Sequence, residues 1–436
     1  MGNVRRRGLA SLAWASVQDL FDQTTAFGRL ALVHVVMMAG DTLVTVSLAG
    51  SLFFSVSPTE AKSKVLAYLL LTIAPFAVVS PILGPLIDHS ANGRRILVAL
   101  SASVRVLLCW SMSQHLNSLW LFPEAFAVLI SSKLYGVTRG ALVPEMARTD
   151  QFHEHATGVG HEGWPSEGVR QGRGFAGFNA QLTLLGTVSG IIAGSVGATL
   201  LKTVGATSVL IVAAAVFVVG TVASVRLQRP AKTVRDEVIM SPEERDLQAL
   251  SPLGEGEVTW GLSASALMRF GVGFGSFLLA FGLRRDHAGL QWFAYALSAS
   301  AVGSLLGLGF VTRMRNALAE SSLLAVAVLA TGLGAGIASR HPTLIDQTVL
   351  AGWLGLCAAV AQPSFDAITQ RLVPTGAQGR TFARFAVRQQ LAWVLGALIP
   401  VAISLNFGAG DQFLALVMVV GGVAYTVGRK VSHHGI

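Results

Sequence analysis

The sequence has few charged residues and almost no cysteine. Asp, Glu, Lys and Arg make up 13% of its 436 residues, whereas soluble domains average about 25%. Because 52% of the residues are hydrophobic, a soluble chain of this length would have to bury most of its surface. The two cysteines, Cys109 and Cys357, lie far apart inside apolar segments, which excludes a disulfide framework. This composition predicts a helical membrane protein.

Signatures of enzymes and of ATP-driven proteins are also missing. The sequence has no Gly-Lys-Ser/Thr phosphate loop, no hydrolase nucleophile elbow and no His-Glu-x-x-His motif. Two short runs, His153-Glu154-His155 and His161-Glu162, contain side chains that could bind a transition metal. Glycines and a proline around them predict a flexible loop. We therefore expect no metal site, no cofactor and no enzymatic activity.

Long apolar segments occupy most of the chain. A membrane-spanning helix needs about 20 residues, and twelve segments meet this requirement: 30–56, 64–87, 96–113, 119–142, 176–201, 205–225, 263–283, 291–311, 318–338, 344–368, 385–407 and 411–428. The 47 glycines are typical of closely packed membrane helices. Residues 1–29 predict a cytoplasmic segment with an interfacial helix rather than a cleavable signal peptide.

The net charge of +9 is concentrated in alternate loops. With a cytoplasmic N-terminus, 22 Lys and Arg residues fall on the cytoplasmic side and 6 on the other side. Cytoplasmic loops carry an excess of Lys and Arg, so both termini are predicted to be cytoplasmic, in the plasma (inner) membrane. The orientation of the protein in the membrane accounts for this distribution of charge, so we expect no nucleic acid partner.

A polar turn joins the second and third spans. Its sequence runs from Gly84 through Asp88 to Gly93-Arg94-Arg95, and adjacent arginines are costly in hydrocarbon. An ordinary basic loop would also satisfy this requirement. The spacing of these five residues, however, resembles the loop between helices 2 and 3 of the major facilitator superfamily. In layout the resemblance covers nearly the whole chain.

The resemblance implies two related six-helix halves. Residues 226–262 form the longest hydrophilic stretch between spans, and we expect them to link the half at 30–225 to the half at 263–428. A tail follows at 429–436. The segment 307–315 follows the eighth span as 84–95 follows the second, with a glycine and bases retained but the acid lost. The fold class is therefore predicted as all-α, with twelve transmembrane helices in pseudo-symmetric halves.

Ionisable residues inside spans are costly and usually functional. Asp41 in span one and Lys133 in span four lie at similar depth, so the two charges could neutralise each other. The resemblance implies that spans one, four, seven and ten line a central cavity, which would be faced by Asp41, Lys133, Tyr135, Arg139 and Arg269. Arg105 in span three does not fit this cavity, and we expect it to snorkel or to contact a neighbouring helix. Asp41 either carries a proton or makes only a helix–helix hydrogen bond.

Two stretches are similar to bacterial exporter-like members of the superfamily: Gly40-Asp41 and the run from Lys133 to Pro144. That branch tends to have a Gly-Pro pair in span five. Here Gly186, Gly190 and Gly194 repeat every four residues without a following proline. The glycines alone predict a face for helix packing. Because the proline is missing, the sequence leaves open whether the protein exchanges drugs for protons.

We predict a monomeric secondary transporter that exports a small amphipathic or lipophilic compound, driven by protons, by alternating access. The apolar cavity spans suit such a substrate better than a polyanion. Uptake of a polar nutrient such as a sugar is a second hypothesis, although span seven offers almost no polar side chains. A non-transporting or lipid-handling membrane protein is a third.

The turn after span two is predicted to act as a cytoplasmic gate. The resemblance implies that its acid, Asp88, pairs with the start of span eleven in the other half. Arg384 and Arg388 are four residues apart and share a helix face, so either could reach Asp88. Arg94 and Arg95 are expected to hold the turn against phosphate or against helix ends.

Overall fold

The computed structural model describes residues 24–52, 91–116, 118, 120–157, 175–227, 256–314, 317–374 and 377–434. The long elements in these ranges are all α-helices, which confirms the all-α prediction for this part of the chain. They are α2 (Ala26–Leu52), α4 (Ala91–Gln114), α5 (Leu121–Thr157), α7 (Phe175–Thr203), α8 (Ala206–Val225), α11 (Gly256–Arg285), α12 (Leu290–Met314), α13 (Glu320–Ala338), α14 (Leu344–Leu372), α15 (Gln378–Ala402) and α16 (Phe407–His434).

In the described ranges, eleven helices are long and apolar enough to cross a membrane. A helix suits that environment because it satisfies its backbone hydrogen bonds internally, whereas hydrocarbon offers no partners. These helices correspond to all the expected spans except the second. That span was predicted at 64–87 and lies outside the described residues.

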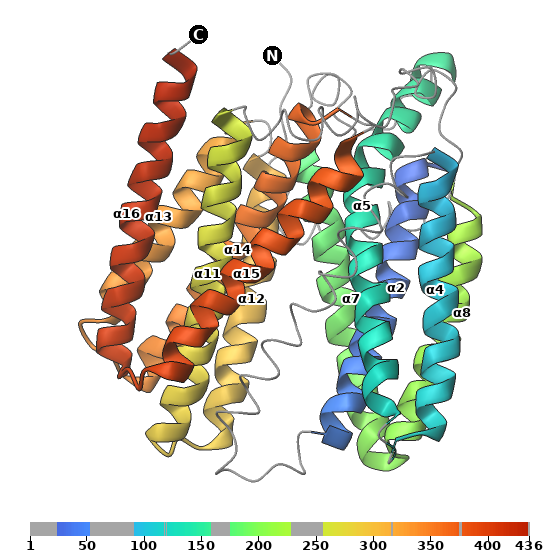
Figure 1. The fold of residues 1–436 in the computed structure, drawn as a ribbon, viewed down its shortest axis with the longest axis horizontal. Coiled ribbons are helices and arrows are strands. Elements are labelled where there is room, and N and C mark those ends of the chain that lie inside the picture. The colour runs from blue at the N-terminus through green and yellow to red at the C-terminus, as the bar shows by residue number, and fades with distance from the viewer. Residues whose placement is uncertain are drawn as a thin grey trace, which may run out of the picture. The chain divides into compact units, whose positions relative to one another are not determined.

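Contacts divide the chain into two compact units, which we describe separately. Unit 1 contains α2, α4, α5, α8 and the part of α7 that begins at Gln181. In this unit α8 packs along both α2 and α4, and α5 also contacts these two helices (Figure 1). A Cβ atom at Gly40 would lie 2.6 Å from the Phe217 ring, so α2 and α8 approach closely because this position lacks a side chain.

Unit 2 contains α11 to α16. Here α12 packs along α14, α11 packs along α15, and α13 lies against α14 and α16 (Figure 1). Glycines again stand at the crossings: a Cβ atom at Gly303 would meet the Gly352 carbonyl, and one at Gly396 would meet the Phe270 carbonyl. Small residues let membrane helices pack backbone to backbone, which explains much of the high glycine content.

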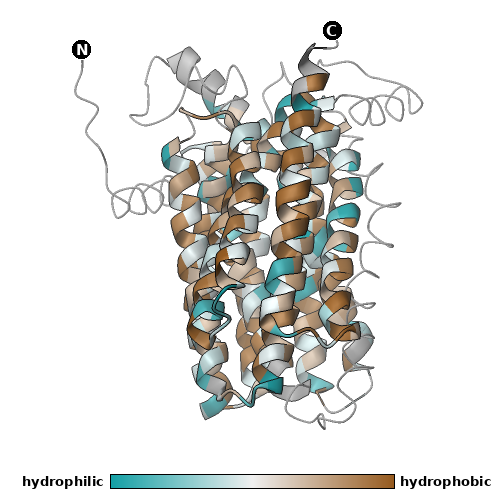
Figure 2. Cartoon of the chain, turned by 90° about the vertical axis from the view of Figure 1, so that its left-hand side faces the viewer, coloured by the Kyte–Doolittle hydropathy of each residue, from teal (hydrophilic) through white to brown (hydrophobic). Residues whose placement is uncertain are grey.

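The outward faces of the helices are largely apolar. Leu107 on α4 and Leu333 on α13 are 70% and 63% exposed. Figure 2 shows hydrophobic residues over much of the helix surface that faces the viewer, with hydrophilic residues near several helix ends. Such a surface is costly in water but suits contact with lipid chains.

Most helices extend beyond their predicted spans, and three do so by the largest margins. Helix α5 was expected to end at 142 but continues to Thr157, α11 begins at Gly256 rather than 263, and α15 begins at Gln378 rather than 385. Hydropathy locates the part of a helix that lies in hydrocarbon, whereas helical hydrogen bonding continues into polar sequence. Arg380 and Arg384, which precede the predicted span, therefore lie within α15 together with Arg388.

Candidate functional site

An aspartate in the middle of α2 forms an ion pair inside unit 1. Asp41 Oδ1 lies 3.2 Å from Nη1 of Arg105 on α4, and the hydroxyl of Ser132 on α5 donates to Asp41 Oδ2 at 2.7 Å. The side chain of Asp41 is 19% exposed, whereas that of Arg105 is fully buried. Three helices therefore meet at one carboxylate that keeps some accessible surface.

The Arg105 guanidinium has further partners around it. Its Nη2 donates to the Ser131 carbonyl at 2.7 Å. The group also lies 5.8 Å from the ring centroid of Tyr135 and 5.2 Å from that of Phe217, distances at which the faces of aromatic rings attract cations. Because arginine keeps its proton in proteins, these contacts hold a permanent positive charge beside Asp41.

His34, about two turns before Asp41 on α2, connects two residues of α5. Arg139 Nη1 donates to His34 Nε2 at 3.1 Å, and His34 Nδ1 lies 3.1 Å from Tyr135 Oη. A guanidinium can only donate, so Nε2 accepts and the ring proton sits on Nδ1. This assignment makes His34 neutral and a donor to Tyr135, whose own hydroxyl can then donate to another acceptor.

Helix α7 packs against this polar face of α2 through glycines. A Cβ atom at Gly186 would lie 2.6 Å from His34 Nε2, and one at Gly190 would lie 3.2 Å from Thr42 Oγ1. Ser189 Oγ donates to the Val35 carbonyl at 2.7 Å, which holds the two helices together. The glycine repeat is thus a packing face, and it leaves room for the imidazole beside Arg139.

We call Asp41, Arg105, His34, Tyr135, Arg139 and Ser132 the unit 1 cluster. It contains three of the predicted cavity residues, and a fourth, Lys133, follows Ser132 directly on α5. From the sequence, Lys133 was expected at a depth similar to that of Asp41, and Arg105 was expected either to snorkel or to contact a neighbouring helix. The structure shows the second of these two roles for Arg105, which is buried and pairs with Asp41.

The fifth predicted cavity residue, Arg269, lies on α11 in unit 2. Its Nη2 donates to Gln362 Oε1 at 3.1 Å, and Gln362 Nε2 donates to Asp366 Oδ1 at 2.8 Å. Gln362 and Asp366 are one turn apart on α14. The amide therefore connects a guanidinium and a carboxylate, and two helices of unit 2 are joined by polar groups.

The predicted gate residues are described only in part. Gly84 and Asp88 lie outside the described residues, so their contact with Arg384 or Arg388 stays a prediction. Gly93, Arg94 and Arg95 lie in the first turns of α4. Arg94 forms a buried ion pair with Glu145 of α5, with 3.1 Å between Nη1 and Oε2. Arg95 Nη2 donates to the Val225 carbonyl at the end of α8, which is the supporting role expected at a helix end.

The histidine-rich stretch differs from the expected loop at its start. His153, Glu154 and His155 lie on α5, which continues to Thr157, while His161 and Glu162 lie outside the described residues. Across the ranges that the structure covers, no group of three or more His, Cys, Asp or Glu side chains is placed to hold a metal ion.

Sequence reasoning missed His34 and Glu145, although each left a signal. His34 lies seven residues before Asp41, so the two share one face of a helix. Glu145 follows Pro144 and was taken to lie beyond the membrane helix. A carboxylate at the end of a span, opposite a pair of arginines near the start of the preceding span, can be recognised as an ion-pair candidate.

A family model described as "Major Facilitator Superfamily" matches residues 30–397, which is most of the chain. The curated relative "Uncharacterized protein ML2143" of Mycobacterium leprae is 29% identical over 436 residues, covering 90% of this chain and 69% of that protein. "Uncharacterized protein Rv0876c" of Mycobacterium tuberculosis is 39% identical over 128 residues. That match covers 27% of this chain and 23% of the relative.

Solved structures of transporters share this fold. The human organic anion transporter MFSD10 (TETRAN) has a TM-score of 0.66 at 13% identity, covering 92% of this chain and 99% of that one. FucP in the outward conformation has a TM-score of 0.65 at 14% identity, with 92% and 98% covered. A bacterial homologue of the iron transporter ferroportin has a TM-score of 0.65 at 16% identity, with 93% and 99% covered. At these identities the likeness shows the fold alone.

Proposed function

Because the chain belongs to the major facilitator superfamily and is therefore a multi-pass membrane transporter rather than an enzyme, we propose that it exports a small amphipathic or lipophilic compound in exchange for protons. The unit 1 cluster is the observation that supports this proposal. Coupling to protons requires a group that binds a proton in one state of the cycle and releases it in another, and the cluster offers a carboxylate with a permanent cation beside it.

Asp41 is suited to carry the proton. It keeps 19% of its side-chain surface accessible, and its carboxylate is held by Arg105 and Ser132. When Asp41 takes up a proton, Arg105 still has the Ser131 carbonyl and two aromatic rings as partners. Protonation thus breaks the ion pair, while the guanidinium keeps partners that lower the cost of its charge inside the membrane.

The fold does not select the substrate. The structural neighbours include an organic anion transporter, a fucose:proton symporter and a bacterial homologue of an iron transporter. The proposed amphipathic substrate rests instead on this chain's own helices. In the middle of the described spans of unit 1 the acidic and basic side chains are Asp41, Arg105, Lys133 and Arg139, and the surrounding residues are mostly apolar.

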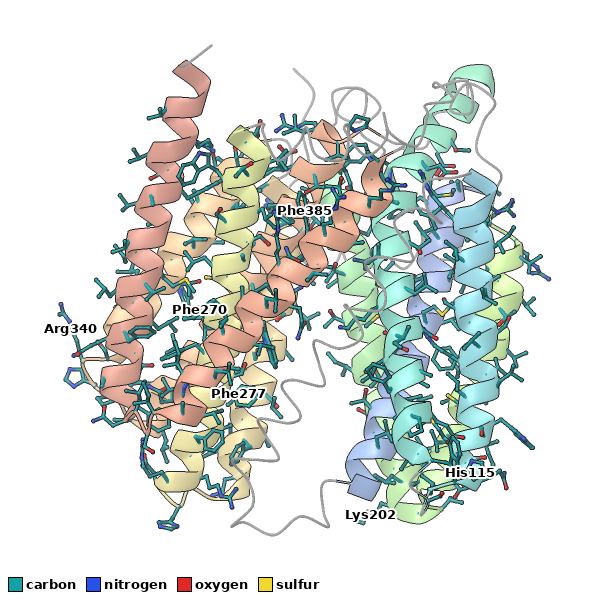
Figure 3. The ribbon with its side chains drawn as sticks, viewed as in Figure 1. His115, Lys202, Phe270, Phe277, Arg340 and Phe385 are labelled. Carbon is teal, nitrogen blue, oxygen red and sulfur yellow. The ribbon has the colours of Figure 1, made fainter. Side chains whose placement is uncertain are left out.

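We also propose that both termini face the cytoplasm across the plasma membrane. Cations gather at one end of unit 1, where Arg29 donates to the Arg226 carbonyl and Arg95 to the Val225 carbonyl. His115 and Lys202 lie at the opposite end (Figure 3). We expect tags at either terminus to be inaccessible in intact cells and accessible after lysis, and labelling from outside would contradict this orientation.

Proton coupling is tested by Asp41→Asn in proteoliposomes. We expect this variant to lose proton-gradient-driven flux by more than tenfold, measured as the substrate-dependent change in lumenal pH over a panel of amphipathic compounds. Because the substitution leaves Arg105 without its carboxylate, the double variant Asp41→Asn/Arg105→Gln is assayed beside it. The double variant removes both charges and should also lack coupled flux while retaining substrate binding.

The exposed Asp286, in the turn after α11, supplies the control. Asp286→Asn removes a carboxylate that is 44% exposed and should leave flux unchanged. If Asp41→Asn retains pH-dependent transport at the wild-type rate, Asp41 only joins helices. If no compound in the panel moves in any variant, the proposed substrate class is wrong.

A further inference from the structure

Unit 2 contains a cavity of about 320 Å³ among α11, α12, α14 and α16. Most of its wall is apolar, with side chains that include Leu278, Phe293, Leu297, Leu350 and Leu354. Small-molecule pockets in proteins have volumes of roughly 300–1,000 Å³ and combine apolar walls with a few polar groups. The size and the wall therefore suit a small, largely apolar ligand.

One carboxylate stands in this wall. Asp411 is fully buried, and its Oδ2 accepts a hydrogen bond from Gln347 Nε2 at 2.5 Å. Its Oδ1 is also buried and has no hydrogen-bond partner among the residues that the structure describes. Both Asp411 and Gln347 line the cavity. Asp411 Oδ1 is therefore an acceptor that no described residue satisfies, at the edge of an apolar cavity.

The described residues of the cavity wall offer this oxygen no positive charge. They include no Lys, Arg or His, so Asp411 is the one ionisable side chain among the described residues that line the cavity. Ser304, another wall residue, donates to the carbonyls of Ser300 and Gly355. Arg285, at the end of α11, donates through Nη1 to the Leu405 carbonyl and through Nε to Asp286.

A buried carboxylate without a counter-charge is strongly destabilising. We propose that the cavity binds a small amphipathic organic cation, with an ammonium group beside Asp411 Oδ1 and an apolar body against the leucines and Phe293. The bound cation completes the ion pair that the protein leaves open. This site goes beyond the proton exchange proposed for Asp41, because it requires neither transport nor a proton gradient.

Equilibrium binding of benzyltrimethylammonium to the full-length protein in nanodiscs tests the proposal. This probe has a permanent charge, so it cannot donate a proton to Asp411. We expect saturable binding of the radiolabelled probe to the wild-type protein in a scintillation proximity assay. Neopentylbenzene, which has the same shape without the charge, should compete at least tenfold less well.

Asp411→Asn should weaken binding of the probe at least tenfold, while its thermal unfolding midpoint should equal or exceed that of the wild type because the substitution removes an uncompensated buried charge. The matched control Asp286→Asn, which removes an exposed carboxylate, should bind as the wild type does. Ala351→Leu leaves the carboxylate in place but narrows the cavity, and it should also weaken binding. If Asp411→Asn does not fold, Ala351→Leu still tests whether the probe binds in this cavity.

Three results would overturn the proposal: no saturable binding to the wild-type protein, equal competition by the neutral isostere, or unchanged affinity in both cavity variants. None of these results would bear on the Asp41 experiment, because that experiment measures coupled flux. Conversely, loss of flux in Asp41→Asn says nothing about Asp411. The two proposals therefore fail separately.

Discussion

Asp41→Asn should lower the free energy of unfolding by about 1–3 kcal/mol, because the Arg105 guanidinium loses its carboxylate but keeps the Ser131 carbonyl and two aromatic rings as partners. The carboxylate lies 3.2 Å from a guanidinium that is fully buried, and arginine cannot escape the penalty by losing its proton. Arg105→Gln should cost less, because Asp41 is 19% exposed and can become neutral by taking up a proton.

The double variant Asp41→Asn/Arg105→Gln should recover most of this loss. Removing both charges leaves no unpaired ion, so the two single losses are not additive. Denaturant unfolding in mixed micelles measures all four proteins of this cycle. Ser103→Ala is the control on α4, since among the described residues Ser103 donates to the Ala99 carbonyl of its own helix, and it should change stability by less than about 1 kcal/mol. Additive losses would show that the pair is not coupled.

The positions of the helices could be read from the sequence, because each span must bury about 20 apolar residues in lipid. The eleven apolar helices found in the described ranges all overlap their predicted segments. Their ends could not be read in the same way. The last turns of α5 and the first turns of α11 and α15 contain polar residues, and polar sequence can continue a helix outside the membrane as readily as it can form a loop.

Pairing between helices was the least predictable feature. The cost of burying a charge singled out Asp41 and Arg105 from the sequence alone. It could not identify them as partners, because that depends on how α2 and α4 are rotated about their axes. In the structure α8 packs along both helices, and the Phe217 ring of α8 lies under the Arg105 guanidinium.

The two units repeat one arrangement with different charges. In unit 1 the first helix, α2, is joined to α5 by Asp41 with Ser132 and by His34 with Tyr135. In unit 2 the first helix, α11, is joined to α14 by Arg269 with Gln362. Each unit thus connects its first helix to a later helix through polar groups. The charged residue on α2 is an acid, Asp41, whereas the charged residue on α11 is a base, Arg269. The coupling proposal accordingly concerns unit 1.

A second buried ion pair, between Arg94 and Glu145, joins α4 to the part of α5 that extends beyond its predicted span. The side chains of Arg94 and Glu145 are 5% and 0% exposed. One turn further along α5, the Asp150 carboxylate accepts hydrogen bonds from the backbone N–H groups of Ala26 and Phe27 at 2.6 and 2.9 Å. These are the first residues of α2, so Asp150 caps that helix.

Glu145→Gln should therefore lower the free energy of unfolding by about 3–5 kcal/mol, because it leaves the Arg94 charge buried beside a neutral amide. Arg226→Gln is the matched control: it removes an exposed cation at the same end of unit 1 and should change stability by no more than about 0.5 kcal/mol. Denaturant unfolding in mixed micelles gives both values.

Hydrogen exchange then distinguishes this ion pair from a general loss of stability. Because Glu145 and Asp150 lie on the same extension of α5, Glu145→Gln should speed exchange in 91–98, 145–157 and the first turn of α2 more than in the middle of α8. The double variant Arg94→Met/Glu145→Leu removes both charges and replaces them with apolar volume, so it should restore slow exchange. A Glu145→Gln variant as stable as Arg226→Gln would contradict the ion pair, and rapid exchange in the double variant would show that the two charges are themselves needed to hold α4, α5 and α2 together at this end.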